Sequence, residues 1–518
     1  MAMTHEIGID LARVWTTPKP SREDKPLRYL AFGDEVEVED DTSKAHVRIR
    51  TAIPETRPDG SVRVRMGSRF IVPKKGLKPK DVLKPLGHCK VMRVEFVDVQ
   101  QGDGALLVTP SKKVMLVDGG DNQLFARYLA GRFRRTSLEK PKDIDCILVT
   151  HGDADHFAGL REIHDSESHE TSWKQLYIRP HRVYHNGLVK RPSKENKKDV
   201  PDVRLLGPTE KLDGRDVIVG LESDLLAVPD SEMNLPFRRW KEALATYRQR
   251  YGPIEFRRLQ KGDDAAFDFL GDGLKVEVLG PIPVTLPDGQ TGIPFLGKPR
   301  GGPHLGNLKF EGVSASHTIN GHSVVLRITY GNVRYLFAAD LNQESEMELL
   351  RHDADRLEAE VLKTPHHGSA DFSTPFIKAV RPVVSVVSSG DESEQKEHIH
   401  PRATLVGALG RHSRVDEPIV LITELAAFFE VRGYVGTKWH AMAAGLKKKD
   451  FEGAVDLTTK KNERFFAFSR SAFGIVRTRT DGKRLVVYTD SGDVAMKEAY
   501  AFDVEPGGIV KHSPVRMA

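Results

Sequence analysis

The chain has 518 residues, of which 39% are hydrophobic and 29% charged, and its formal net charge is +5. This length and composition predict a globular protein with room for two or more domains. Residues 1–9 lack the pattern of a signal peptide, and no run approaches about 20 consecutive apolar residues, so we expect a cytoplasmic protein without a membrane partner. The two cysteines, Cys89 and Cys146, exclude a disulfide framework and a zinc ribbon. The mild positive charge is compatible with a polyanionic partner but does not establish one.

Residues 1–80 have the pattern of a small all-β module. Strands are expected, with turn residues between them, at residues 10–15, 29–32, 35–38, 47–49 and 62–66. The pattern resembles a bacterial Src-homology-3-like barrel, and such a barrel would dock the chain on a protein partner. A sheet that merely braces the rest of the chain is the equally favoured alternative. Residues 74–84 are rich in lysine and proline, which predicts a linker.

From residue 91 the pattern changes to apolar strands that alternate with helical segments. Residues 92–99, 105–108 and 114–117 predict strands, and residues 123–133 predict a helix. The third strand leads into Asp118, whose two following glycines allow a tight turn. This alternation predicts an α/β fold in which a sheet is covered by helices.

The densest group of metal-ligating side chains directly follows the apolar run at residues 147–149, which predicts a buried strand. Its members, within six consecutive positions, are His151, Asp153, Asp155 and His156. A single strand-to-helix turn can direct all four side chains at one place. Imidazole nitrogens and carboxylate oxygens crowded in this way need a cation, which makes a metal site the favoured interpretation. The alternative is a solvated acidic turn that happens to contain two histidines.

Six segments, taken in order, resemble the metallo-β-lactamase fold and in particular the hydrolase domain of ComEC-type competence proteins. They are residues 98–103, 116–120, 151–156, 320–327, 335–340 and 361–369, followed by His400-Pro401. Gln100 stands where the family has glycine. The membrane channel of true ComEC proteins is missing, so the resemblance does not imply DNA import.

The resemblance implies an αββα sandwich over residues 88–415, preceded by the N-terminal module. It also implies inserted material at about 165–320 and a β-rich extension at 416–518. After about residue 420, apolar residues at 428–429 and 465–468 predict buried strands, and residues 447–449 predict a basic loop.

The inserted material contains an amphipathic helix and a basic run. The helix is expected at residues 236–251, and one face carries Phe237, Trp240, Leu244 and Tyr247, which favours packing over base stacking. The basic run is either a solvated loop or a set of nucleic-acid contacts, and its charged members are Lys190, Arg191, Lys194, Lys197 and Lys198.

By the resemblance, the site holds two divalent metal ions. His151 and Asp153 would bind the first ion and Asp155 and His156 the second. Asp340 would bridge the two ions, and His367 would complete the second set. The carboxylate-rich loop favours manganese over zinc.

The remaining ligand of the first ion is expected between residues 320 and 323. His322 is the better donor chemically, whereas Asn320 matches the position in the family, and the sequence does not decide between them. A surface histidine on a turn is the alternative interpretation of His322. Asp118 is expected to orient a ligand rather than to be one.

Two adjacent metal ions generate a hydroxide at neutral pH and clamp the oxygens of an in-line displacement, which favours phosphoester chemistry. Asp155, His366 and His400 are the expected catalytic residues. The last two would contact phosphate or protonate the leaving oxygen, or His400 would only shape the pocket. The predicted function is a metal-dependent phosphodiesterase, with a DNA nuclease favoured. The alternatives are a hydrolase of a small phosphodiester, such as a cyclic nucleotide or a choline phosphate, and a recruitment component docked through the N-terminal module.

Overall fold

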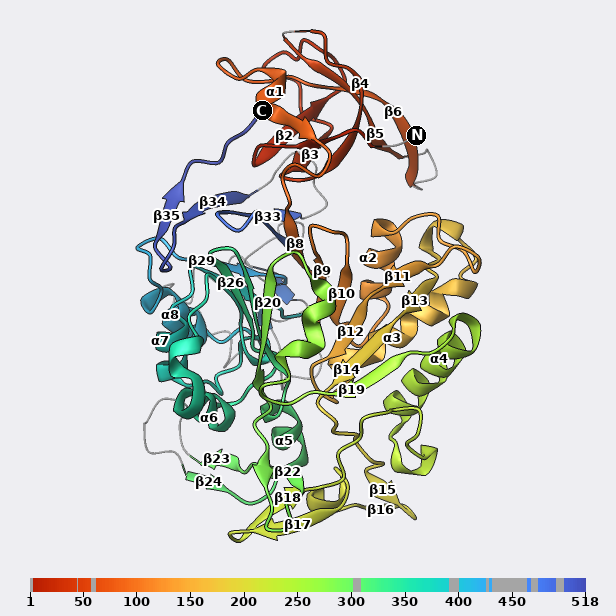
Figure 1. Ribbon diagram of the computed structural model, residues 1–518, viewed down its shortest axis with the longest axis vertical. Helices are drawn as coiled ribbons and strands as arrows, with labels where there is room; N and C mark the ends of the chain where they lie inside the picture. Colours follow the sequence, from red (N-terminus) through yellow and green to blue (C-terminus); the bar gives the residue numbers. More distant parts are fainter. Residues whose placement is uncertain are drawn as a thin grey trace, which may run out of the picture.

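The structure is a computed structural model that describes residues 3–43, 45–56, 62–300, 309–390, 400–424, 428–430, 464–466, 474–490 and 498–518. In this part of the chain a β-rich module at one end adjoins two sheets with helices on their outer sides (Figure 1). Within the described ranges, none of the helices combines the length and the hydropathy needed to cross a membrane.

The larger sheet of the sandwich combines strands from residues 92–258 with strands from residues 475–513. Its strand order is β19-β14-β12-β10-β9-β8-β32-β33-β34-β35. The strands are β8 (Met92–Phe96), β9 (Gly104–Val108), β10 (Val114–Asp118), β12 (Cys146–Val149), β14 (Arg182–His185), β19 (Glu255–Arg258), β32 (Ile475–Thr480), β33 (Arg484–Asp490), β34 (Ala499–Val504) and β35 (Val510–Ser513).

The smaller sheet has the strand order β20-β25-β26-β27-β28-β29. Its first three strands are antiparallel neighbours, and β26 to β29 run parallel. The strands are β20 (Leu274–Gly280), β25 (Val325–Tyr330), β26 (Val333–Phe337), β27 (Val361–Lys363), β28 (Val384–Val387) and β29 (Ile419–Ile422).

The central strands of both sheets are buried on two faces, which explains why β10, β12 and β28 are almost continuously apolar rather than alternating. In β10, Met115 and Val117 face the core between the sheets, where they join residues of β20 and β25 to β28. Val114 and Leu116 face the opposite side and pack with the helices that cover the larger sheet. The predicted sheet covered by helices is therefore confirmed.

Helices cover the outer side of each sheet (Figure 1). On the larger sheet these are α2 (Leu124–Arg132), α3 (Ala154–Asp165) and α4 (Leu235–Tyr251), and on the smaller sheet α6 (Gln343–Asp353), α7 (Thr374–Val380) and α8 (Ala403–Arg411). The predicted amphipathic helix is α4. Phe237, Trp240, Leu244 and Tyr247 are all buried in the core beneath it, which confirms packing as the role of this stripe.

The expected insert at 165–320 is not one separate block, because β14, α4, β19 and β20 belong to the sandwich. The remainder forms small additional sheets at the end of the molecule opposite the N-terminal module (Figure 1). Their strands are β15 (Lys194–Glu195), β16 (Lys198–Asp199), β17 (Thr209–Leu212), β18 (Arg215–Ile218), β21 (Val284–Thr285), β22 (Thr291–Pro294), β23 (Lys298–Arg300) and β24 (Lys309–Glu311). A further strand of this range, β13 (Ile178–Pro180), instead pairs with β11 (Lys142–Ile144). The short helix α5 (Ala315–Gly321) follows and leads into β25.

The region expected to form a C-terminal extension is also part of the sandwich. β29 hydrogen-bonds to β28, and β32 lies between β8 and β33 in the larger sheet. The strands expected at residues 428–429 and 465–466 are present as β30 (Phe428–Glu430) and β31 (Arg464–Phe466), which pair with each other. Residues 467–468 and the basic residues 447–449 lie outside the described residues.

The N-terminal residues form the expected all-β module, with strand order β3-β2-β6-β5-β4-β1-β7. The strands are β1 (His5–Ile7), β2 (Leu11–Trp15), β3 (Arg28–Ala31), β4 (Glu35–Asp40), β5 (Val47–Thr56), β6 (Val62–Ile71) and β7 (Leu83–Pro85). The expected linker instead contributes to this module, since α1 (Pro79–Val82) leads into β7, which pairs with β1. The Src-homology-3-like identity of the module stays a prediction.

The last residues of the chain lie along β2 and join the module to the sandwich (Figure 1). The Leu11 backbone N–H donates to the carbonyl of Arg516 (3.1 Å), and the Ala518 N–H donates to the carbonyl of Leu11 (3.0 Å). The buried carboxylate of Asp10 accepts from Nε of Arg484 in β33 (3.1 Å) and pairs with Nη2 of Arg516 (3.2 Å). These contacts favour the bracing interpretation of the module.

We expect Asp10→Ala to lower the free energy of unfolding by about 3 kcal/mol, because it leaves the buried Arg484 guanidinium without a main counter-ion. Denaturant titration followed by circular dichroism would measure the change. Lys511→Gln is the control, since Lys511 and Glu505 form an exposed pair and its loss should not be measurable. An equal effect of the two substitutions would contradict the bracing role of Asp10.

Candidate metal centre

Side chains with metal-ligating atoms gather where strands of the two sheets end. Asp118 is the last residue of β10, and residues 150–153 connect β12 to α3, whose first turn carries Asp155 and His156. From the smaller sheet, Asp340 follows β26 and His367 follows β27. The carboxyl ends of neighbouring strands form a natural crevice for ligands in α/β sheets, and the sandwich brings two such edges together.

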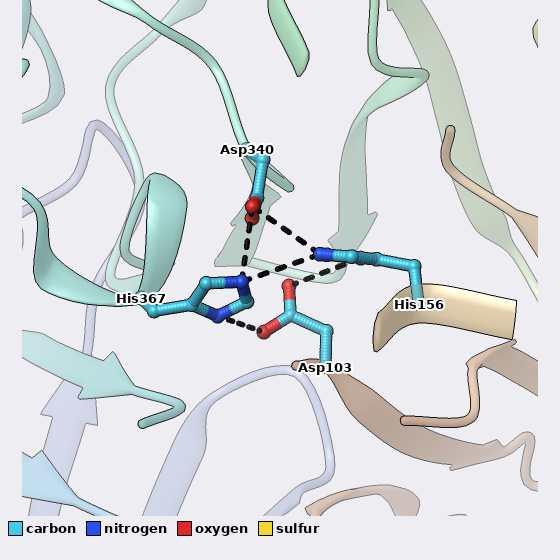
Figure 2. A group of neighbouring side chains, drawn as sticks. All are labelled: Asp103, His156, Asp340 and His367. Carbon is cyan, nitrogen blue, oxygen red and sulfur yellow. Dashed lines mark hydrogen bonds and ion pairs between the residues drawn. The ribbon is translucent and has the colours of Figure 1, made fainter. Parts of the chain in front are cut away.

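Four buried residues form the centre of this group (Figure 2). Asp103, His156, Asp340 and His367 each offer a nitrogen or oxygen atom, and these atoms all lie within 4.8 Å of one another. Asp103 directly precedes β9, and His156 comes from the first turn of α3. A cluster of this kind in a protein interior needs a cation or protons to balance its carboxylates.

The Nε2 atoms of the two histidines converge with carboxylate oxygens at distances that suit one metal ion. His367 Nε2 lies 3.0 Å from Asp340 Oδ2, 3.4 Å from Asp155 Oδ2 and 3.4 Å from His156 Nε2. His156 Nε2 lies 3.3 Å from Asp340 Oδ2. Tetrahedral ligands about 2.0–2.1 Å from an ion are separated by about 3.3 Å, so these residues fit such an ion.

The other nitrogen of each ring is held from behind by an acceptor. His156 Nδ1 lies 2.9 Å from Asp118 Oδ2, and His367 Nδ1 lies 3.1 Å from the carbonyl oxygen of Ser388. Asp118 in turn accepts from the backbone N–H (2.8 Å) and the hydroxyl (2.7 Å) of Thr150. With a proton on Nδ1, each ring presents the lone pair of Nε2 to a cation. Asp118 thus occupies the place expected of an orienting carboxylate.

Asp103 and Lys363 belong to the centre, although the sequence did not single them out. Asp103 Oδ1 lies 3.4 Å from His367 Nδ1, on the far side of that ring from Asp340 (Figure 2). The Lys363 ammonium contacts Asp103 Oδ2 and lies 4.0 Å from Asp340 Oδ1. Both residues lie within segments that carry the family resemblance, 98–103 and 361–369, but neither was assigned a role in the site.

Gly102 lets Asp103 approach the metal loop. Its φ is +102°, and an added Cβ would lie 1.8 Å from the backbone oxygen of Asp155. Other positions beside the centre adopt the same left-handed conformation without being glycine: Asp118, Ala339, His366 and His367. Such conformations cost about 1–3 kcal/mol each and persist where the surrounding structure imposes them, typically at functional sites.

In the metal-free centre, protons on two histidines hold the place that a cation would take. Burial by itself would lower the pKa of His156 and His367, but Asp340 and the other nearby carboxylates raise both well above the usual value. Burial would raise the pKa of Asp340, but the two imidazolium rings hold it well below the usual range. Protons on the histidines therefore balance the carboxylates, and a metal ion can take their place.

His151 lies next to this centre as a neutral donor. Its ring is 4.0 Å from that of His156, and its Nδ1 lies 3.1 Å from Thr150 Oγ1 and 3.3 Å from Ser323 Oγ. Its Nε2 is buried without a hydrogen-bond partner among the described residues. Burial, followed by the charge of His156, holds the pKa of His151 well below its usual value.

Asp153 has its carboxylate oxygens engaged by other side chains. Oδ1 accepts from the Lys190 ammonium at 2.8 Å. The amide of Asn320 is oriented by its partners, and its nitrogen donates to Asp153 Oδ2 at 2.8 Å. The amide oxygen then lies 3.3 Å from His366 Nε2.

His322 is not brought into the centre, which corrects its assignment as a candidate ligand. Its Nε2 donates to the carbonyl oxygen of Pro294 at 2.8 Å, and its backbone oxygen accepts from Asn186 at 3.0 Å. The side chain is also not a surface group, since the residue is only 6% exposed. Burial lowers the pKa of His322 to about 4, so the ring is neutral.

The expected catalytic histidines lie beside the centre. His366 Nδ1 is buried without a hydrogen-bond partner among the described residues, and burial lowers the pKa of the ring. The ring centroid of His400 lies 6.1 Å from that of His366 and 6.5 Å from that of His367. Their catalytic roles stay predictions.

The basic run divides into two parts. Lys190 reaches the metal loop, and Arg191 pairs with Glu232 at 2.5 Å. The exposed members lie on or beside the β15–β16 hairpin, away from Asp153: Lys194, Lys197 and Lys198. Among the expected nucleic-acid contacts, only Lys190 touches a residue of the metal-loop motif in the described structure.

Comparison with known proteins agrees with this geometry. Residues 102–232 match the family model of the metallo-beta-lactamase superfamily, so the chain carries a domain of this superfamily. The matched range contains Asp103 and the metal loop, whereas Asp340 and His367 lie beyond it and are brought in by the fold. No curated protein is significantly similar to the chain. The narrower resemblance to ComEC-type hydrolase domains stays a prediction.

We expect metal uptake to release protons from His156 and His367. Because their raised pKa values stabilise the metal-free protein below about pH 6.5, that contribution should be lost as pH rises through the raised pKa values. As pH is raised from 6 to 9, the melting temperature of the metal-free protein should therefore fall. The increase in melting temperature that manganese produces should become larger over the same range. Scanning calorimetry with and without a chelator measures both. A gain that is independent of pH would show that these histidines do not bind the ion.

Proposed function

We propose that this protein is a metal-dependent phosphodiesterase with nucleic acid as its preferred substrate. One observation carries the proposal. The Nε2 atoms of His156 and His367 meet oxygens of Asp155 and Asp340 at 3.0–3.4 Å in a buried site, with both rings held from behind. This arrangement suits a resident divalent ion, and members of the matched superfamily are mostly metal-dependent hydrolases.

A divalent ion bound there supplies a Lewis acid that polarises a phosphoryl oxygen and lowers the pKa of water. The chain itself orients the donors. Asp118 and the Ser388 carbonyl fix the two rings, and Lys363 balances Asp103. Since oxygen ligands from carboxylates suit harder ions, manganese is preferred over zinc in this proposal.

Several features favour a phosphodiester over a neutral substrate. Lys190 places a positive charge beside the metal loop. Burial keeps His366 neutral, so that its ring can accept a proton near the centre. Three exposed lysines on or beside the β15–β16 hairpin, which outnumber the acidic Glu195 and Asp199 there, offer further contacts to a polyanionic substrate.

A small phosphodiester is the second candidate. It is favoured by the close packing of residues 186–190 and α4 against the metal loop. A Cβ at Gly152 would lie 2.9 Å from the Phe237 ring and 3.2 Å from the carbonyl oxygen of Leu188. This packing narrows one side of the site. A protein partner for the N-terminal module stays a prediction.

We expect Asp155→Asn to reduce manganese-dependent cleavage of DNA more than a hundredfold, because loss of even an outer partner of a metal ligand commonly costs about 10–100-fold. Linear and circular DNA, analysed on gels, would separate exonuclease from endonuclease activity. Asp165→Asn, an exposed position on the same helix, is the matched control. Full activity in the Asp155 variant would rule out the proposed centre.

We expect DNA affinity to fall steeply with salt, since each phosphate contact releases counter-ions and adds about 0.9 to the slope of log K against log salt. Substituting glutamine at Lys194, Lys197 and Lys198 together should lower that slope if the hairpin contacts phosphates. Fluorescence anisotropy over a salt series measures it. Salt-independent binding, with hydrolysis of bis-p-nitrophenyl phosphate retained, would instead support the small phosphodiester.

A further inference from the structure

Lys190 is built into the metal centre by the inserted segment that carries it. Its ammonium lies 2.8 Å from Asp153 Oδ1. Its backbone carbonyl accepts from the N–H of Asn234, which caps α4, at 2.9 Å. The preceding Leu188 and Val189 are buried, and the Asn186 side chain accepts from the Leu188 N–H and donates to the His322 carbonyl (both 3.0 Å). The segment is thus held by hydrogen bonds at Asn186 and at the Lys190 carbonyl, and the Lys190 side chain points toward Asp153.

The ligand set expected for a first metal ion is largely engaged in other ways. Asp153 binds Lys190 through one oxygen and Asn320 through the other. Asn320 is held further by His366 and by the carbonyl of Ser316, to which its nitrogen donates at 3.2 Å. His322 faces Pro294. Among the ligand atoms expected for this ion, two are buried without a hydrogen-bond partner in the described part of the chain: Nε2 of His151 and Oδ1 of Asp340, the expected bridging residue.

The two lysines of the centre differ in exposure, which separates their roles. The Lys363 side chain is 5% exposed and lies between Asp103 and Asp340, so it balances carboxylates inside the protein. The Lys190 side chain is 26% exposed and that of Asp153 is 20% exposed. Because the Lys190 ammonium is partly exposed, it can release the Asp153 carboxylate and bind an oxyanion that enters from solvent.

We propose that Lys190 is the second cation of the centre. In this proposal, which rests on the proposed function, the protein binds one divalent ion through Asp155, His156, Asp340 and His367. The Lys190 ammonium takes the place that a second ion has in a two-metal site and binds an oxyanion of the phosphoryl group. Asp153 positions Lys190 and is not a metal ligand.

Manganese binding tests the role of Asp153. After loading with manganese chloride and desalting, elemental analysis should find one ion per chain in the unsubstituted protein and in Asp153→Asn. Calorimetric titration should give Asp153→Asn a dissociation constant within about threefold of the unsubstituted value, whereas Asp155→Asn should weaken binding by about tenfold or more. Two ions per chain, or equal losses in the two variants, would overturn the proposal. A complete lack of metal binding would instead overturn the proposed function.

Phosphate binding tests the role of Lys190. Titrating inorganic phosphate into the manganese-loaded protein should show about a tenfold loss of affinity in Lys190→Gln and recovery in Lys190→Arg. Lys241→Gln is the matched control, because Lys241 is similarly exposed and pairs with Asp230 on the same region of the fold. Unchanged phosphate affinity in Lys190→Gln, with the ion still bound, would overturn the role of Lys190 while leaving the metal centre intact.

Discussion

The structure depends on balancing several carboxylates that are buried at one place. Asp103, Asp118 and Asp340 are almost fully buried, and protons on His156 and His367 together with the Lys363 ammonium offset their charge. An uncompensated buried charge is strongly destabilising, so every member needs its partners in position. This arrangement requires unfavourable backbone conformations, since Asp118 and His367 both have positive φ. It also requires a glycine at position 102, where the chain lies against the backbone oxygen of Asp155. The same constraint prepares the site for a cation, because a metal ion can take over the balance that the protons provide.

The balance extends outward through elements that were expected to be peripheral. Gly152 is closely packed against residues 186–190 and the first turn of α4. Lys190, in the same segment, forms an ion pair with Asp153. Inserted material therefore contributes both packing and charge to the metal loop. At the other end of the molecule, β32 completes the larger sheet beside β8, and residues 516–518 pair with β2. The N-terminal module is consequently joined to the sandwich by the last residues of the chain and by Arg484 of β33, which donates to Asp10.

Much of the local structure could be predicted from the sequence, because it depends on nearest neighbours and simple periodicities. The strand that ends at Val149, the turn with its ligating side chains and the helix from Ala154 follow from an apolar run, a dense polar motif and small residues. The stripe on α4 follows from helical spacing. The order of motifs along the chain was enough to associate Asp340 and His367 with the metal loop, and the match at residues 102–232 agrees with the superfamily.

Tertiary structure decided what the individual side chains do. His322 and Asn320 are only two positions apart, and both are chemically plausible ligands. The His322 side chain nevertheless faces Pro294 and that of Asn320 faces Asp153, because the chain turns at the end of α5. Asp103 and Lys363 gained their roles only when β9 and β27 were brought together, since a charged residue at a strand end has no local signature of its partner. The sequence by itself determined the donor atoms and the loop that carries most of them. Their division into ligands, orienting groups and counter-ions required the two sheets to meet, because charge balance and hydrogen bonding act between residues that are distant in the chain.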